Sequence, residues 1–230
     1  MTSLDNAFWE ALGSHHSSFA QVAPGARRYF ADVSPLCAVR DTTDHGCWRD
    51  LADLMGERER IGLLLWSVPD VGSDLQLLQS APLVQMTFTG DPAALPPAES
   101  ISCRDLTAAD ADSMISLVAL TKPGPMERRT VELGRYVGAH DASGKLIAMS
   151  GERARLAGWT EVSAVCTHPD HRGKGLARQL MLVIMRDIIA RDELPFLHVA
   201  AANIGAQQLY QTLGFAVRRE GVHVAVRRAR

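Results

Sequence analysis

Several features that define whole classes of protein are missing from this sequence of 230 residues. Its most apolar run, residues 61–68, is far too short to span a bilayer. Residues 1–10 carry neither a basic cluster nor a long apolar run, so we expect no signal peptide and no membrane contact. Cysteine is scarce and forms no Cys-x-x-Cys pair, which favours reduced thiols in a cytoplasmic protein. The cysteines are Cys37, Cys47, Cys103 and Cys166.

Lysine is missing from residues 1–100, which hold 6 arginines against 13 acidic residues. Residues 101–230 instead hold 18 basic residues against 13 acidic ones. The basic half favours an anionic ligand, and the acidic half favours a cationic partner or substrate. Basic and aromatic residues are not interleaved, so we expect no nucleic-acid partner. The hydrophobic content of 47% is ordinary for a soluble globular protein.

Hydrophobic periodicity divides the chain into two regions. Residues 1–95 predict an α/β region of unclear topology, with helices at 3–12 and 48–55 and strands at 61–68 and 84–89. Residues 91–99 are rich in proline and alanine and predict a linker, which places a domain boundary between the regions 1–95 and 101–230.

The second region has a sharper pattern and no internal repeat. It predicts a strand, two helices, three antiparallel strands, a helix, a strand, a helix and a final two-stranded hairpin. The expected strands are 101–105, 135–140, 145–155, 160–167, 195–200, 215–218 and 222–227, and the expected helices are 107–120, 127–133, 176–188 and 204–213. The sequence therefore predicts an α/β fold.

A glycine-rich turn follows the strand expected at 160–167, and it reads Arg172-Gly173-Lys174-Gly175-Leu176-Ala177. A turn of this kind at the start of a helix leaves backbone N–H groups free at the positive end of the helix dipole, which suits phosphate. The P-loop pattern fails, because it needs glycine at 168 and a hydroxyl residue at 175. The dinucleotide pattern also fails, because it needs a small residue at 178 and a parallel βαβ unit.

The turn fits the pattern Arg-x-x-Gly-x-Ala, and a second motif follows at Asn203, Ala206, Leu209-Tyr210 and Gly214-Phe215. With both motifs, residues 101–230 resemble the GNAT superfamily of N-acetyltransferases. The resemblance implies a mixed, mostly antiparallel central sheet flanked by helices. Residues 1–95 lie outside it, as an additional α/β region that is either part of the acceptor site or a degenerate acyltransferase-like half.

The resemblance also implies which residues bind acetyl-CoA. The loop would hold the pyrophosphate, the end of the preceding strand would bond the pantetheine arm through its main chain, and the later helix would contact that arm. The residues concerned are Val165, Cys166, Thr167, Arg172, Gly173, Lys174, Gly175, Leu176, Ala177, Asn203 and Ala206. Strand alternation places Cys166 on the core face, so we interpret its side chain as a packing residue and not a nucleophile.

Alternation places Glu161 on the polar face of the same strand, together with Ser163, Val165 and Thr167, and we expect this face to line the cleft. Acylation needs a neutral amine, so a general base is useful. Glu161 lies eleven residues before Arg172, the offset of the base in the histone-acetylating members. We take it as the base candidate, with an ion-paired structural carboxylate as the alternative and Glu152 in reserve.

Tyr210 lies two helical turns after Asn203, so both side chains project from one helix face. The resemblance implies that Tyr210 protonates the departing thiolate, and an aromatic anchor at the helix end is the alternative. His15-His16 and His45-Gly-Cys47 lack a second ligand cluster, so we expect no metal.

The resemblance thus implies an enzyme that moves an acetyl group from acetyl-CoA to the amine of a small molecule or peptide, by direct attack in a ternary complex. Two alternatives stay open. One is a CoA-binding regulatory module without catalysis, and the other is an acyltransferase that uses a longer acyl-CoA or a hydroxyl acceptor. The oligomeric state stays open as well.

Overall fold

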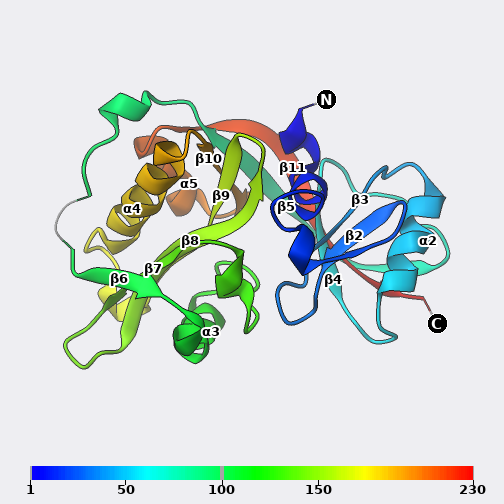
Figure 1. Ribbon diagram of the computed structural model, residues 1–230, viewed down its shortest axis with the longest axis horizontal. Helices are drawn as coiled ribbons and strands as arrows, with labels where there is room; N and C mark the ends of the chain where they lie inside the picture. Colours follow the sequence, from blue (N-terminus) through cyan, green and yellow to red (C-terminus); the bar gives the residue numbers. More distant parts are fainter. Residues whose placement is uncertain (1, 99–100, 230) are drawn as a thin grey trace.

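The computed structural model describes residues 2–98 and 101–229. Its strands form an eight-stranded sheet in the order β4-β11-β5-β10-β9-β8-β7-β6 and a small sheet in the order β1-β2-β3 (Figure 1). The strands are β1 (Ala20–Val22), β2 (Ala26–Tyr29), β3 (Cys37–Val39), β4 (Ile61–Leu65), β5 (Leu75–Phe88), β6 (Cys103–Leu106), β7 (Tyr136–His140), β8 (Leu146–Leu156), β9 (Trp159–Thr167), β10 (Leu194–Ala200) and β11 (Phe215–Arg228). The large sheet is antiparallel except between β9 and β10.

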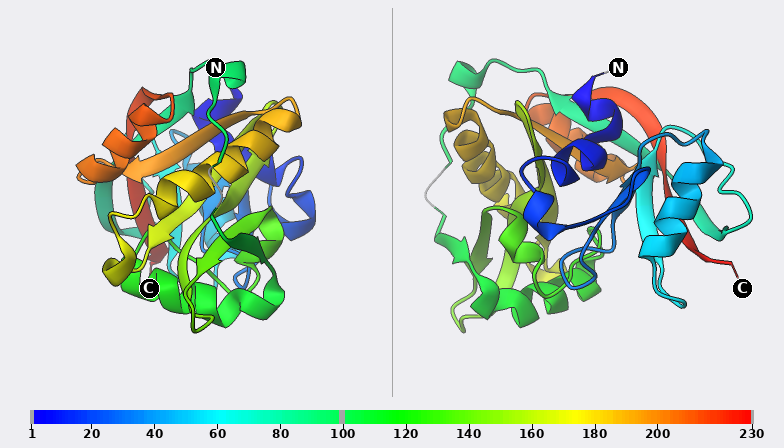
Figure 2. Two further views of the ribbon diagram at one scale, coloured as in Figure 1. Left: turned by 90° about the vertical axis from the view of Figure 1, so that its left-hand side faces the viewer. Right: turned by 45° about the vertical axis from the view of Figure 1, so that its right-hand side comes forward.

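The helices cover both faces of this sheet (Figures 1 and 2). The α-helices are α1 (Ala7–Leu12), α2 (His45–Leu54), α3 (Ala111–Thr121), α4 (Leu176–Ala190) and α5 (Ile204–Thr212), and the 3₁₀ helices are η1 (Ser3–Asn6), η2 (Ser17–Phe19), η3 (Pro92–Ala94), η4 (Ala108–Asp110), η5 (Thr130–Leu133) and η6 (Pro169–His171). The helices α4 and α5 share one hydrophobic cluster on one face, while α1 and α3 pack on the other. The helical spacing of Leu180, Ile184 and Ile188 explains the first cluster, because all three side chains are fully buried in it.

The regions 1–95 and 101–230 contribute to the same large sheet. Strand β5 of the first region lies between β10 and β11 of the second, and β4 pairs with the far edge of β11. The predicted linker contains η3, and its Leu95 is buried against the α4 cluster, whereas Glu99 lies outside the described residues. The domain boundary stays a prediction, and the topology shows that the two regions share a sheet.

Strands β9 and β10 pair over three residues and then separate. The parallel register joins Leu194–Phe196 to Trp159–Glu161, although both strands continue. A bulge at Ala164, which has a φ of 54°, follows on β9 and shifts its register against β8. Ser163 and Val165 are therefore partly exposed in the middle of the sheet, where interior strands are normally covered. The separation opens the sheet beside β9.

Most expected elements of the second region are present, and the final hairpin is wrong. Thr107 caps the α3 segment, and Gly214, with a φ of 88°, ends α5, both as expected. Residues 215–228 form one continuous strand, because β5 is long enough to pair along all of it. A bulge at Arg218 shifts the register between Val217 and Arg219. Gly221 pairs with Leu83 inside this strand and makes no turn, and its lack of a side chain allows close packing, since a Cβ there would lie 2.4 Å from the Leu65 carbonyl oxygen.

The first region differs more from its prediction. Strand β5 begins at Leu75, nine residues before the expected strand at 84, and the sheet β1-β2-β3 was not predicted. In the second region, the helix expected at 127–133 is the short η5.

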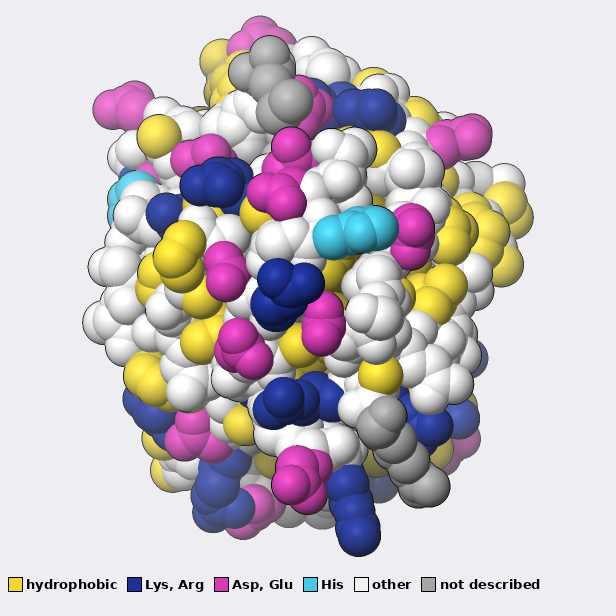
Figure 3. Space-filling model, turned by 90° about the vertical axis from the view of Figure 1, so that its right-hand side faces the viewer, with side chains coloured by type: hydrophobic (Ala, Val, Ile, Leu, Met, Phe, Trp, Pro, Cys, Tyr) yellow, Lys and Arg dark blue, Asp and Glu magenta, His cyan; other side chains and the backbone are white. Residues whose placement is uncertain are grey.

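Figure 3 views the end of the molecule around α2 and β4 and shows acidic and basic side chains interspersed there. The acidic excess of the first region therefore does not form a single-sign surface on that face. In the described parts of the chain, no helix is both long and apolar enough to cross a membrane.

Candidate functional site

The glycine-rich loop presents free backbone N–H groups at the start of α4. The N–H groups of residues 173–178 make no hydrogen bond within the described chain, and the first regular helical bond comes from Gln179 to Gly175. Gly173 and Gly175 have φ values of 76° and 72°, the left-handed region that turns the amides of the loop to one side. Gly175 is also the N-cap of α4. The geometry is that of an anion site with a helix dipole behind it.

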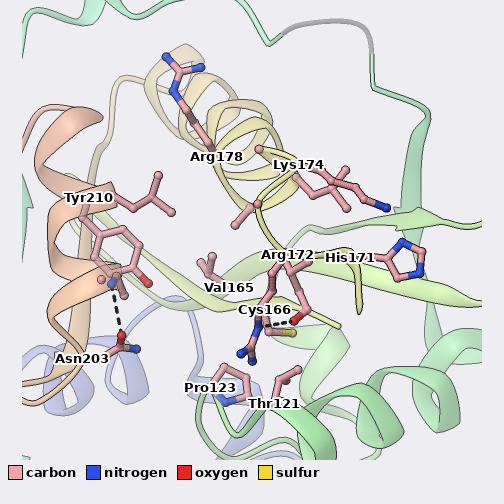
Figure 4. Close-up of a pocket in the computed structure, with 18 of the residues that line it drawn as sticks. Thr121, Pro123, Val165, Cys166, His171, Arg172, Lys174, Arg178, Asn203 and Tyr210 are labelled. Carbon is pink, nitrogen blue, oxygen red and sulfur yellow. Dashed lines mark hydrogen bonds between the residues drawn. The ribbon is translucent and has the colours of Figure 1, made fainter. Parts of the chain in front are cut away.

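This loop forms one wall of a cleft of about 660 Å³ beside the separation of β9 from β10. Every residue expected to bind the cofactor lines this cleft, and so does Tyr210. The cleft is lined by Thr121, Lys122, Pro123, Val165, Cys166, Thr167, His171, Arg172, Gly173, Lys174, Gly175, Leu176, Ala177, Arg178, Asn203, Gly205, Ala206, Leu209 and Tyr210. The structure thus brings the two sequence motifs to one site (Figure 4). That these residues contact acetyl-CoA stays a prediction.

Tyr210 lines the cleft from α5, and Asn203 lines it from the N-cap position of the same helix (Figure 4). Asn203 accepts a hydrogen bond from the Ala206 N–H at 3.2 Å and so caps the helix. The Tyr210 hydroxyl has no hydrogen-bond partner in the described chain. Burial raises the pKa of Tyr210 to about 12, so the phenol keeps its proton at neutral pH. A protonated, unpaired hydroxyl in a cleft can donate to a ligand.

The charged side chains of the loop point in different directions. The Arg172 guanidinium points toward Thr121 and Pro123 across the cleft, and its Nε donates to the Thr167 carbonyl at 3.4 Å (Figure 4). Lys174 and Arg178 extend away from Tyr210. The charge of Arg172 therefore faces the cleft, whereas those of Lys174 and Arg178 lie on its rim.

Cys166 contributes to both the core and the cleft. Its side chain is 6% exposed and packs in the cluster beneath α3, as expected of a packing residue. Burial raises the pKa of its thiol to about 11, so it stays protonated. The bulge at Ala164 changes the simple alternation, because it lets Val165, Cys166 and Thr167 all reach the cleft.

Glu161, the expected general base, does not line the open cleft. Its side chain is fully buried and makes two hydrogen bonds, of 2.8 and 2.6 Å, with Arg153, and a third of 2.7 Å with Nδ1 of His198. Burial alone would raise the pKa of Glu161, but the Arg153 charge and these hydrogen bonds outweigh it and lower the pKa to about 2. A covered carboxylate that is this weakly basic cannot remove a proton from an ammonium group efficiently. The observed pairing is the one expected of an ion-paired structural carboxylate, and the role of Glu161 in proton transfer stays a prediction.

The reserve carboxylate, Glu152, is also engaged elsewhere. It is 4% exposed, pairs with Arg191 at 2.9 Å and does not line the cleft. In the part of the chain that the structure describes, no group of three or more histidine, cysteine or acidic side chains is placed to hold a metal ion.

Glu161 belongs to a line of polar side chains that crosses five neighbouring strands, β8, β9, β10, β5 and β11, on the α1 face of the sheet. We call this line the polar row. Its members in spatial order are Arg153, Glu161, His198, Gln85, Arg218 and Asp5. Each contacts the next at 2.6 to 3.1 Å. Local sequence patterns do not reveal the row, because its contacts join residues up to 213 positions apart.

The hydrogen bonds of the polar row are mutually consistent. Arg218 donates to Oε1 of Gln85, so the amide nitrogen of Gln85 is free to donate to the Leu4 carbonyl and to Nε2 of His198. The proton of His198 then lies on Nδ1, where it is donated to Glu161. The available sequence signals for part of the row were the alternating polar residues on β9 and the single polar residue, His198, in the apolar strand β10.

Comparisons with known proteins agree with this geometry. A family model of FR47-like proteins matches residues 136–224. A structure from Novosphingobium aromaticivorans, named as an acetyltransferase of the GNAT family, is 31% identical over 100% of both chains, with a TM-score of 0.89. No curated protein sequence matches this chain.

Two more distant structures share the fold. The GCN5-related N-acetyltransferase from Kribbella flavida has a TM-score of 0.62 and 16% identity, covering 94% of this chain and 93% of its own. A tandem GNAT protein from the clavulanic acid biosynthesis pathway has a TM-score of 0.56 and 16% identity, covering 87% of this chain and 77% of its own. The expected mixed sheet flanked by helices is confirmed. With 31% identity to a full-length relative and the free amides of the loop in place, the chain belongs to the GNAT family of acetyltransferases.

Proposed function

We propose that this protein transfers an acetyl group from acetyl-CoA to the amine of a small molecule or peptide, by direct attack in a ternary complex. The observation that carries the proposal is the arrangement of one cleft. The free N–H groups of residues 173–178 and the unpaired hydroxyl of Tyr210 line the same cavity of about 660 Å³. An anion site next to a proton donor suits a ligand with a pyrophosphate at one end and a departing thiolate at the other.

The separated strand β9 supports binding of the pantetheine arm. Beyond Glu161, the β9 edge that faces β10 has no strand partner in the described sheet. An extended arm with two amide groups can add to such an edge as a further strand would, next to Val165 and Thr167. A main-chain N–H near Val165 would then polarise the thioester carbonyl.

Catalysis under this proposal rests mainly on positioning the two substrates. Tyr210 would donate its proton to the thiolate of CoA as the carbon–sulfur bond breaks. Glu161 has no part in proton removal, so the acceptor would enter as the free amine or lose its proton to water. Residues 121–133 and parts of the region 1–95 would form the acceptor site, because they lie on the face of the sheet opposite α4.

The proposal is tested by measuring acetyl-CoA binding by calorimetry and release of free CoA with a panel of amines. We expect binding and amine-dependent release. Tyr210→Phe should lower kcat about 100-fold with little change in acetyl-CoA affinity, because it removes one proton donor. Tyr29→Phe is the matched control, since its hydroxyl bonds His16 and is outside the cleft. Binding without CoA release from any amine or alcohol would instead indicate a non-catalytic module, and unchanged kcat in Tyr210→Phe would exclude the assigned proton donor.

A further inference from the structure

Arg153 is held in one orientation and keeps one nitrogen free. Its Nε and Nη2 both donate to Glu161, and its guanidinium carbon lies 5.4 Å from the centre of the Phe8 ring. The third nitrogen, Nη1, has no hydrogen-bond partner in the described chain and is not fully buried. The residue as a whole is 9% exposed. An arginine fixed on one edge and one face can therefore offer a ligand only its remaining edge.

That free edge faces the connection between α3 and η5. A Cβ built on Gly124 would lie 3.8 Å from Nη1, at ordinary contact distance, so the free edge lies beside a residue that has no side chain to cover it. The residues just before it, Thr121, Lys122 and Pro123, line the cofactor cleft. Nη1 thus lies on the face of the sheet where the acceptor would approach, next to the segment that borders the cleft.

The polar row explains why Arg153 is rigid. Glu161 is itself fixed by His198, which Gln85 holds from the other side. A donor that is already oriented loses little conformational entropy when it binds a ligand. Tyr136, beneath α3, has a buried hydroxyl with no partner in the described chain. Burial raises the pKa of Tyr136, and the charge of Arg153 acts in the opposite direction.

The charges around this edge favour an anion. Residues 122–129 contain three basic residues and one acidic residue, Glu127. Arg128 and Arg129 have carboxylate partners, whereas Lys122 has none in the described chain. Glu161 neutralises Arg153 but is fully covered, so a ligand meets the donor nitrogen and not the carboxylate. An oxyanion is the group that such an edge binds best.

We infer that Nη1 of Arg153 binds a carboxylate of the acceptor, so that the acceptor is an aminocarboxylate: an amino acid, or a peptide with a free carboxyl group near its amine. This inference rests on the proposed function and adds the substrate class. A charge-assisted hydrogen bond from a fixed guanidinium discriminates between a carboxylate and its amide. When an acceptor without a carboxylate binds, Nη1 of Arg153 hydrogen-bonds only to water.

The test uses the intact protein, acetyl-CoA and a series of linear aminocarboxylates of increasing length, each paired with its carboxamide. Rates of CoA release are expressed per unprotonated amine, because amidation changes the pKa of the amine. For at least one chain length, kcat/KM should be about tenfold higher for the carboxylate than for the amide. Arg153→Lys, which keeps the charge beside Glu161, should lower this ratio at least about fivefold through KM.

Arg155→Lys is the matched control, since Arg155 lies on the same strand and is likewise paired, with Glu193, whereas Arg153 is the arginine beside Gly124. It should leave the ratio unchanged. Equal rates for carboxylates and amides in the unaltered protein would overturn the inference and leave the proposed function intact. This outcome does not depend on whether any variant folds. An unchanged ratio in Arg153→Lys would also overturn it. Absence of acetyl-CoA binding, measured separately by calorimetry, would instead defeat the proposed function.

Discussion

The two sides of the separation between β9 and β10 use their polar groups in opposite ways. On the cleft side, the N–H groups of residues 173–178 have no partner in the described chain. On the α1 side, each polar side chain of the polar row contacts the next at 3.1 Å or less. Free groups at a surface cleft are available to a ligand, whereas paired groups in the interior fix the strands that form the cleft.

The two sides therefore differ in whether their polar groups are available to a ligand or stabilise the sheet. Glu161 and Tyr210 both had chemistry that suits proton transfer, but only Tyr210 keeps an unpaired polar group at the cleft. The electrostatic environments of the two groups differ: the buried ion pair lowers the pKa of Glu161 to about 2, while burial raises that of Tyr210 to about 12. Changes to the fully paired groups of the α1 side should therefore affect stability, and changes to unpaired groups at the cleft should affect ligand binding.

The largest effect should come from truncating the carboxylate at the centre of the polar row. Glu161→Ala leaves the guanidinium of Arg153 buried without a counter-charge, which should lower the free energy of unfolding by about 3 kcal/mol or more. Urea unfolding followed by circular dichroism measures this loss. Glu161→Gln, which keeps the shape and part of the hydrogen bonding, should lose less. A loss below about 1 kcal/mol in the alanine variant would show that the row contributes little support.

Protonation should reproduce part of this effect without a mutation. The pKa of Glu161 is about 2 in the folded protein and 4.5 in the unfolded chain, so its contribution to stability is complete above the higher value. As the pH falls from about 5 toward 2, the unfolded state takes up the proton first and the contribution is lost. The loss should be smaller than in Glu161→Ala, because a neutral carboxyl group still fills the site. Acid titration of unfolding should be less steep in Glu161→Gln than in the unaltered protein, and equal slopes would contradict the assignment.

On the cleft side, a single methyl group should act on binding more than on stability. Gly173 and Gly158 both have a φ of 76° and open space where a Cβ would lie, but only Gly173 lines the cleft. Alanine at either position should cost about 1 kcal/mol of stability from the left-handed backbone. Only Gly173→Ala should also weaken acetyl-CoA binding, by about tenfold in calorimetry, because its Cβ enters the space that the pyrophosphate would occupy. Equal affinities in the two variants would place the phosphates elsewhere.

The same division explains what the sequence could predict. The loop from Arg172 to Ala177 is contiguous and leads into a strongly periodic helix, so its place after a strand followed from local pattern alone. The polar row could not be predicted from local pattern, because Gln85 and Arg218 are 133 residues apart and meet only where β5 lies between β10 and β11. The bulge at Ala164 gave no signal either, since alanine has no preference for a positive φ.

The expected face of Glu161 shows how such a local pattern fails. Alternation along β9 correctly separated polar from apolar positions, but it carries no information on what covers the polar face. That face is covered by α1, which lies near the opposite end of the chain. Its Phe8 ring packs against Arg153 and His198. A carboxylate that seemed exposed by alternation is therefore buried by a long-range contact.

The smallest effect should arise at the outer end of the polar row, where Arg218 holds the N-terminal segment. It donates to Asp5 at 2.6 Å and to Thr2 at 2.7 Å, from a side chain that is 21% exposed. Arg218→Gln should lower stability by about 1 kcal/mol and speed amide hydrogen exchange in residues 2–12. Arg219→Gln is the control, because Arg219 is more exposed and lies 3.7 Å from Asp5. If amide exchange in residues 2–12 accelerates equally in both variants, surface charge and not the polar row holds this segment. If acetyl-CoA affinity falls in Arg218→Gln, the polar row and the cleft are coupled, and the separation of structural support from ligand binding is wrong.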